Sequence, residues 1–276
     1  MLTKTETTYA PRFTSADLAN SITERIEELA RSTDVARNSE KMIKYLDTYS
    51  RFHNYSIYNI FCIMMAYPDA TQVAGFHRWR SMGRYVRKGE KGIPILAPIL
   101  VNEDPDDPDS EKVLRGFKVV RVFDVSQTDG EPLPEPPNWK SPEKNKKLEE
   151  KLIQFANKRG IRVSVVKLRG GTQGVSKGKL IEIDPSAGTK TLIHEIGHEI
   201  LHRDENRPTE SCLRELEAES VAYVVCKHFG LEISSSPNYI ALHGADSEMI
   251  MGHLERIRKT SIEIIKEIDN EITTID

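Results

Sequence analysis

Apolar and polar residues follow two periods along this chain, one typical of helices and one typical of strands. Apolar residues at helical spacing predict helices over residues 15–30, 40–49, 55–66, 142–159 and 247–272. Extended apolar runs predict strands over residues 93–101, 117–125, 161–166 and 180–183. Because helices and strands are mixed, and the second strand alternates as an antiparallel partner of the first, the pattern indicates an α+β fold.

A proline-rich segment separates two groups of predicted elements. Asp129–Trp139 holds four prolines in eleven residues, a composition that is typical of a linker. We therefore expect an N-terminal α+β domain over residues 1–130, a linker over residues 131–141 and a C-terminal domain over residues 142–276.

The composition indicates a soluble globular protein of two domains. Of the 276 residues, 38% are hydrophobic and 29% are charged, and the net charge of −3 gives no overall argument for nucleic-acid binding. The first residues lack the apolar core of a signal peptide, and the most apolar run, Ile60–Ala66, is far shorter than a membrane span. We expect a cytoplasmic protein with no membrane association. Its three cysteines form no C-x-x-C pair and are not proposed as metal ligands.

The most informative motif is His194-Glu195-x-x-His198, which lies within an apolar pattern of helical period. The spacing of four places both imidazoles on one face of a helix, one turn apart, where they can share a metal ion. Glu195 then lies beside the ion, where a carboxylate acts as the general base of a zinc hydrolase. The motif predicts one catalytic Zn²⁺ ion, although such a site also accepts other divalent ions.

A third protein ligand is expected, because catalytic zinc sites use three and keep the fourth position for water. The next predicted helix carries Glu215, Glu217 and Glu219. The helical period places Glu215 and Glu219 on one face and directs Glu217 elsewhere, towards solvent or a neighbouring arginine. We assign Glu215 as the third ligand and Glu219 as an acceptor that orients a histidine N–H. The reverse assignment of these two glutamates stays open.

Other polar residues of the same domain are candidates for supporting roles. His202 lies one turn beyond His198 and, by helical rise, about 12 Å from His194, so we expect it to pack or to orient a ligand rather than to bind the ion. No spacing rule identifies the residue that stabilises an oxyanion. The candidates, which all lie downstream in the same domain, are Tyr223, Tyr239 and His243.

Residues 76–92 combine six basic residues with aromatic rings and one acid. Proteins hold single-stranded nucleic acid with cations that follow the phosphates and rings that stack on the bases. A run of charges is also common on a solvated surface that binds nothing. The candidate DNA contacts are Arg78, Trp79, Arg80, Arg84, Tyr85, Arg87, Lys88 and Lys91.

Several motifs resemble those of known families. Glu215–Ala222, following H-E-x-x-H, resembles gluzincins and, more closely, ImmA/IrrE-like metallopeptidases, which implies a compact zincin fold. Asn54–Asn59, Gly75–Trp79 with Gly83–Pro94, and Val122–Gly130 together resemble the N-terminal domain of ArdC-type antirestriction proteins. That resemblance implies a first domain that binds single-stranded DNA and a second that is metallopeptidase-like, in a protein often encoded by plasmids and other mobile elements.

Three functions are compatible with these features. The first is a DNA-associated zinc metallopeptidase that protects incoming DNA against restriction. The second is a single-strand-binding protein that protects by occupancy, with a metal that only holds the C-terminal domain together. The third is a regulatory protease that cleaves a repressor, as the ImmA-like resemblance implies. A peptide substrate, whose identity is unknown, would add to the edge of the strand predicted at 180–183.

Overall fold

The computed structural model describes residues 14–31, 35–103, 110–133, 145–203, 207–233, 237 and 247–273. The chain divides into two compact units, one made of residues 1–25 and 61–130 and the other of residues 26–60 and 131–276. Both contain helices and strands, so the predicted α+β mixture is confirmed. Among the described residues, none of the helices combines the length and the hydropathy needed to cross a membrane.

The first unit is built on an antiparallel sheet of order β1-β4-β3, made of Val73–Gly75, Lys112–Asp124 and Ile93–Asn102. A second pair, β2 (Arg84–Val86) with β5 (Thr128–Gly130), is also antiparallel. The strand predicted at 117–125 begins earlier, at Lys112, because pairing with β3 continues through a shift of register between Ile99 and Leu100. The short helix α4 (Phe76–Ser81) and the 3₁₀ turn η1 (Val125–Gln127) complete the β-rich part.

Two of the three boundaries between the units fall within helices. Helix α1 covers Ser15–Arg31, and helix α3 covers Ile57–Ala66. On α1, Leu18 and Ile22 are buried, as the helical spacing of its apolar residues predicts. On α3, apolar residues surround the axis, and Ile60, Phe61 and Ile63 are buried.

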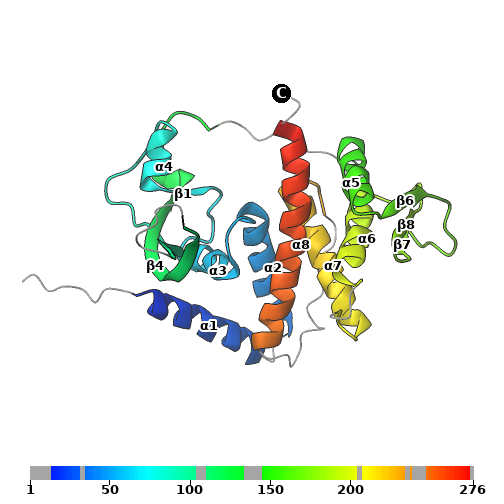
Figure 1. Ribbon diagram of the computed structural model, residues 1–276, viewed down its shortest axis with the longest axis horizontal. Coiled ribbons are helices and arrows are strands. Elements are labelled where there is room, and N and C mark those ends of the chain that lie inside the picture. Colours follow the sequence, from blue (N-terminus) through cyan, green and yellow to red (C-terminus); the bar gives the residue numbers. More distant parts are fainter. Residues whose placement is uncertain are drawn as a thin grey trace, which may run out of the picture. The chain divides into compact units, whose positions relative to one another are not determined.

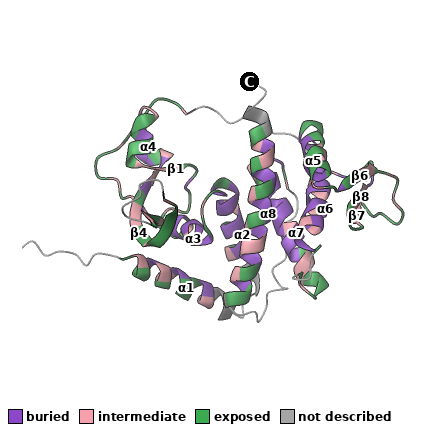
Figure 2. Cartoon of the chain, viewed as in Figure 1, coloured by how far each residue is buried: buried purple, intermediate pink, exposed green. Residues whose placement is uncertain are grey.

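The second unit is a group of helices with a small sheet (Figure 1). Its helices are α2 (Val35–Arg51), α5 (Lys146–Lys158), α6 (Thr189–Leu201), α7 (Ser211–His228) and α8 (Ser247–Thr273). Helix α7 packs against α6, α8 and α2, and from Leu216 to Cys226 nearly all of it is buried (Figure 2). A helix that is covered on several sides needs small and apolar residues all round, which the run Val221–Cys226 supplies.

The small sheet has the order β6-β8-β7. Strands β6 (Arg162–Val165) and β8 (Leu180–Ile183) are parallel, and β7 (Gly174–Ser176) pairs antiparallel with β8. The residues predicted to offer a free edge, 180–183, form the central strand, so that prediction is wrong. The edge strand beside α6 is β7, whose three residues are too short a run to show a strand pattern in the sequence.

Residues 26–60, which we placed in the first domain on sequence grounds, group with the second unit. Long-range hydrogen bonds explain this: the Tyr49 hydroxyl of α2 donates to the carbonyl of Arg258 on α8 at 2.6 Å. The Tyr223 hydroxyl of α7 donates to Asp47 Oδ1 on α2 at 2.7 Å. The third boundary follows Gly130, next to the proline-rich segment, most of which lies outside the described residues.

Candidate metal centre

The H-E-x-x-H motif lies on α6, and its two histidines face one another one turn apart. Their Nε2 atoms are 3.0 Å apart, and the rings meet at 78°. Both side chains are partly exposed, His194 by 19% and His198 by 16%. Two ring nitrogens this close, with access to solvent, offer adjacent ligands to one ion.

Glu215 on α7 completes a triangle with these nitrogens. Its Oε2 lies 3.3 Å from His194 Nε2, and its Oε1 lies 3.3 Å from His198 Nε2. Three ligands placed about 2.0–2.1 Å from a tetrahedral ion are separated by about 3.3 Å, so the three residues fit a divalent metal. The structure therefore brings His194, His198 and Glu215 together as the sequence proposed.

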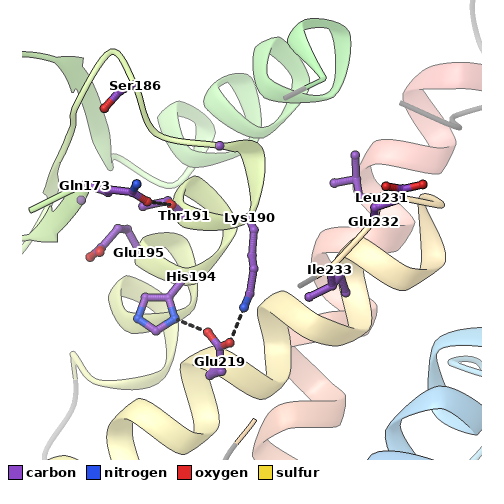
Figure 3. Close-up of a pocket in the computed structure, with 12 residues that line it drawn as sticks. Gln173, Ser186, Lys190, Thr191, His194, Glu195, Glu219, Leu231, Glu232 and Ile233 are labelled. Carbon is purple, nitrogen blue, oxygen red and sulfur yellow. Dashed lines mark hydrogen bonds and ion pairs between the residues drawn. The ribbon is translucent and has the colours of Figure 1, made fainter. Parts of the chain in front are cut away.

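Glu219, the other candidate ligand, meets the opposite side of His194. Its Oε2 lies 3.3 Å from His194 Nδ1, and its carboxylate also pairs with Lys190 (Figure 3). Among the described residues the buried Nδ1 has no hydrogen bond of good geometry, but the nearby Glu219 carboxylate favours a proton on Nδ1, and the lone pair of His194 then lies on Nε2, which faces Glu215. This geometry favours Glu215 as ligand and Glu219 as the acceptor that orients His194.

His202 performs the same task for His198. Its Nε2 lies 2.9 Å from Glu217 Oε2, so Nε2–H donates to the carboxylate and Nδ1 keeps its lone pair. His198 Nδ1 is 3.0 Å from that Nδ1 and can donate its proton to it. The lone pair of His198 then lies on Nε2. Both ligand histidines are thus held in the tautomer that a cation requires.

Glu217 lies at the centre of a buried polar network. Its carboxylate is fully buried and accepts from His202, from His253 at 2.7 Å and from Arg256 Nε at 2.9 Å. The expectation that Glu217 points to solvent is wrong, whereas the alternative of a neighbouring arginine is correct. The helical period showed that Glu217 lies on a different side of α7 from Glu215. It could not show that α8 covers that side, because the α8 residues His253 and Arg256 are more than thirty residues away in sequence.

The pKa values describe these carboxylates and histidines without a bound ion. Burial alone would lower the pKa of His194, but Glu215 and Glu219 outweigh burial and raise that pKa to about 9. Hydrogen bonds from His194 and His198 hold the pKa of Glu215 far below its usual range. Burial would raise the pKa of Glu217, yet His202 and His253 lower it to about 2. The centre thus concentrates negative charge that favours a cation.

Glu195 lies beside the triangle and against strand β7. The residue is 8% exposed, and burial raises the pKa of its carboxyl group. A Cβ atom on Gly174 would lie 2.8 Å from Glu195 Oε1 and 2.8 Å from Thr191 Cγ2, so only glycine leaves room for this carboxylate. Sequence reasoning missed Gly174, whose only signal was its place in a glycine-rich turn.

Glu199 anchors the sheet to the metal-site helix. It is 1% exposed and accepts hydrogen bonds from the Ser176 hydroxyl at 2.5 Å and from the backbone N–H groups of Gly178 and Lys179 at 2.8 Å. These contacts tie the β7–β8 turn to α6. Sequence reasoning missed this role too, because a glutamate one position after His198 carries no signal of its own.

Two clefts of about 520 and 630 Å³ open on the centre, and Gly174, His194 and Glu195 line both. The smaller cleft also contains Lys190, Glu219 and Glu232, and the larger one contains Arg207 and Arg214 (Figure 3 shows the smaller). Of the oxyanion candidates, Tyr223 is buried and donates to Asp47, away from these clefts. Tyr239 and His243 lie outside the described residues.

The basic segment of the first unit is only partly available to DNA. Trp79 is 2% exposed, and its Nε1–H donates to the carbonyl of Phe123 at 2.8 Å. A buried indole cannot stack on a base, so Trp79 is not retained among the proposed DNA contacts. Arg84 donates to Thr128, and Arg87 pairs with Glu90 and Asp129, so both guanidinium groups are used within the fold.

The remaining candidates face solvent. Tyr85 is 59% exposed. Four cationic side chains are exposed and make no hydrogen bond or ion pair with any residue that the structure describes: Arg78, Arg80, Lys88 and Lys91. This leaves one ring and four cations for contact with a nucleic acid.

Comparison with known proteins finds a family similarity for the N-terminal part of the chain. Residues 14–125 match the family model of the N-terminal domain of anti-restriction factor ArdC. An uncharacterised protein of Bacillus anthracis is 27% identical over 332 aligned positions, which take in 99% of this chain and 55% of that protein. The chain thus spans about half the length of this curated relative.

Two solved structures are also similar to the chain, and both are of the antirestriction protein ArdC from plasmid R388. The metal-free one is 17% identical, with a TM-score of 0.46 over 77% of this chain and 85% of that one. The Mn(II)-bound one is 18% identical, with a TM-score of 0.47 over 82% of this chain and 98% of that one.

Proposed function

We propose, from the match of residues 14–125 to the N-terminal domain of anti-restriction factor ArdC, that the protein is a DNA-associated, metal-dependent peptidase that protects incoming DNA. In this proposal the first unit binds single-stranded DNA and the second hydrolyses a peptide bond. The observation that carries the hydrolytic part is the convergence of His194, His198 and Glu215 within 3.3 Å of one another, beside the buried carboxylate of Glu195.

His194, His198 and Glu215 would hold one divalent ion, and we propose Zn²⁺ because two imidazoles and a carboxylate are its usual catalytic ligands. When bound, such an ion supplies Lewis acidity, which polarises a carbonyl group and makes water a better nucleophile near neutral pH. Glu219 and His202 hold the two imidazoles in the required tautomers. These contacts keep the ligands in place before any ion or substrate arrives.

Glu195 is the proposed general base. Its carboxylate would accept a proton from the attacking water and pass it to the nitrogen of the leaving amine. Burial raises the pKa of this group, and a pKa moved towards neutrality favours both halves of that transfer. An extended substrate would lie along the edge of β7, with Gly174 next to Glu195, and occupy the clefts on either side.

The test compares wild-type protein with Glu195→Gln. We expect the variant to keep its metal, measured by elemental analysis, and to lose hydrolysis of a denatured protein substrate by about 10²–10⁴-fold. His198→Ala is the companion variant, which should lose both hydrolysis and the ion held by His194, His198 and Glu215. If Glu195→Gln hydrolysed as fast as wild type, the assignment of Glu195 as base would be wrong.

A second candidate function is protection by DNA binding alone, with a metal that only stabilises the fold. Its support is the exposed ring of Tyr85 together with four exposed cations in the same segment. Protection of transformed DNA against restriction in cells separates the two functions. Full protection by Glu195→Gln favours occupancy, and its loss with single-strand affinity unchanged favours catalysis.

A further inference from the structure

A second group of metal-binding side chains lies in the helical unit, separate from the centre on α6. It is formed by His53, which follows α2, by His228 at the end of α7 and by Asp269 on α8. One ligand atom from each residue lies within 4.8 Å of those of the other two. The three residues come from distant parts of the chain, so no sequence motif predicts the group.

The contacts of His228 leave a lone pair facing a carboxylate. Its Nδ1 is 3.2 Å from the carbonyl oxygen of Ser50, which can only accept, so Nδ1 carries the proton in the neutral ring. The lone pair then lies on Nε2, which is 3.3 Å from Asp269 Oδ2. Two acceptors at this distance repel one another unless a proton or a metal ion lies between them.

His53 supplies a second nitrogen donor next to that pair. Its side chain is buried, with 9% of the residue exposed, and its ring meets that of His228 edge to face with centroids 4.6 Å apart. Its Nε2 lies 3.2 Å from the side-chain amide of Asn54; with the amide oxygen turned towards the ring, Nε2 carries the proton and the lone pair lies on Nδ1, which is buried and makes no hydrogen bond with any described residue.

We propose that His53, His228 and Asp269 form a second divalent-cation site that fastens the end of α2 to α7 and α8. Two imidazoles and one carboxylate are ligands suited to Zn²⁺ and related transition-metal ions. The 3.3 Å between His228 Nε2 and Asp269 Oδ2 matches the separation of about 3.3 Å expected for two ligands of a tetrahedral ion. Asp269 is 43% exposed, so the ion can enter from solvent and keep a water ligand.

The site is structural in this proposal. Glu195 and the triangle of His194, His198 and Glu215 take no part in it. We assign a purely structural role to its three ligands and no general base beside them. Binding to the folded state alone raises the apparent stability of that state. The three ligands are separated by 175 and 41 positions in the sequence (53 to 228 and 228 to 269), so the ion would join elements that lie far apart in the chain.

The experiment counts Zn²⁺ ions bound to the full-length chain by equilibrium dialysis and elemental analysis. Because this site and the centre on α6 are counted separately, we use His194→Ala/His198→Ala to remove the latter. We expect two ions in wild type, one in His194→Ala/His198→Ala, one in Asp269→Asn and none in the combined variant. Glu263→Gln is the matched control, since Glu263 is a carboxylate on the same helix with the same 43% exposure, and it should keep both ions.

Stability provides an independent readout. In the His194→Ala/His198→Ala background, added Zn²⁺ should raise the midpoint of thermal unfolding, and Asp269→Asn or His228→Asn should abolish that rise while leaving the metal-free midpoint nearly unchanged. If Asp269→Asn bound as many ions as its parent, or if Zn²⁺ left the midpoint of the His194→Ala/His198→Ala protein unmoved, His228 and Asp269 would form only a protonated ion pair and the proposal would be overturned. A wild type that loses its single ion in Asp269→Asn would support this site and refute the one on α6.

Discussion

A Cβ atom on Gly197 of α6 would lie 3.4 Å from the Cα atom and 3.6 Å from the Cβ atom of Ala218 on α7. The two helices therefore approach one another closely at this point, next to His198 on α6 and close to Glu215 on α7. Helices come this close only where both present small side chains. The proximity of Gly197 and Ala218 is what allows the Glu215 carboxylate to reach both Nε2 atoms.

Replacing Gly197 by valine should separate α6 from α7. A branched side chain there cannot be accommodated without moving backbone atoms, so we expect a loss of about 1–3 kcal/mol in the free energy of unfolding and weaker metal binding. Urea unfolding in chelator and a metal titration measure the two effects. Gly197→Ala is the control, because a single methyl group at 3.4–3.6 Å makes ordinary contacts. Equal metal affinity in Gly197→Val and wild type would contradict this account.

Replacing Gly174 by alanine should impair Glu195 without removing the ion. The added methyl group would lie 2.8 Å from Glu195 Oε1, which must rotate away or displace β7. We expect metal content to stay at the wild-type level and hydrolysis to fall by at least about 10-fold, since general-base geometry is sensitive to small displacements. Gly252→Ala is the control, because a Cβ atom there would meet nothing within 4 Å.

Replacing Glu217 by glutamine should destabilise the second unit more than the same replacement of the exposed ligand Glu215. The buried carboxylate compensates His202, His253 and Arg256, and breaking such a network costs about 3–5 kcal/mol. Glu215→Gln is the matched control two residues away, since Glu215 is 63% exposed. In chelator it should change the free energy of unfolding by less than about 1 kcal/mol. Chemical unfolding of both variants provides the measurement.

Asp124 should make the free energy of unfolding of the first unit depend on pH in the acidic range. Burial would raise its pKa, but hydrogen bonds from Ser126, Thr71 and Gln72 outweigh burial and hold the pKa below its ordinary value. The unfolded carboxyl therefore takes up a proton at higher pH than the folded one. The stabilisation is fully present above about pH 4 and is lost as pH falls through the folded pKa.

The corresponding variant is Asp124→Asn. We expect it to lose about 2 kcal/mol at pH 7, because the charged acceptor of several hydrogen bonds becomes neutral. The difference from wild type should shrink at pH 3, as measured by urea unfolding at both pH values. A difference that stayed constant or grew on acidification would have the wrong sign for a lowered pKa.

The exposed cations of the first unit should govern single-strand affinity. Changing Arg78, Arg80, Lys88 and Lys91 to glutamine should weaken binding and reduce the slope of log K against log salt by about 0.7 for each phosphate that is no longer neutralised. Tyr85→Ala should cost about 1–3 kcal/mol if the ring stacks on a base. Fluorescence anisotropy with labelled oligonucleotides at several salt concentrations measures both effects.

Trp79→Phe is the contrasting variant, because it changes a buried side chain of the same segment and not an exposed one. It should lower the stability of the first unit by removing the hydrogen bond to Phe123, and leave the salt slope of the folded protein unchanged. A Trp79→Phe protein that folds normally but loses single-strand affinity would restore Trp79 as a DNA contact.

Local periodicity in the sequence determined much of this protein. The spacing of His194 and His198 requires one helical face, and the same period separates Glu215 and Glu219 from Glu217. The apolar stripes predicted the helices, and runs of apolar residues predicted β3, β4, β6 and β8. These features depend on residues within a few positions of one another, and the geometry of a single helix or strand is enough to relate them.

Only the tertiary structure decided what each face meets. It buried Trp79 and Glu217, moved residues 26–60 to the second unit and made β7, rather than β8, the edge strand. It also brought His53 to His228 and Asp269. A period specifies which residues share a face, but burial and pairing depend on the element that covers that face, which can come from anywhere in the chain.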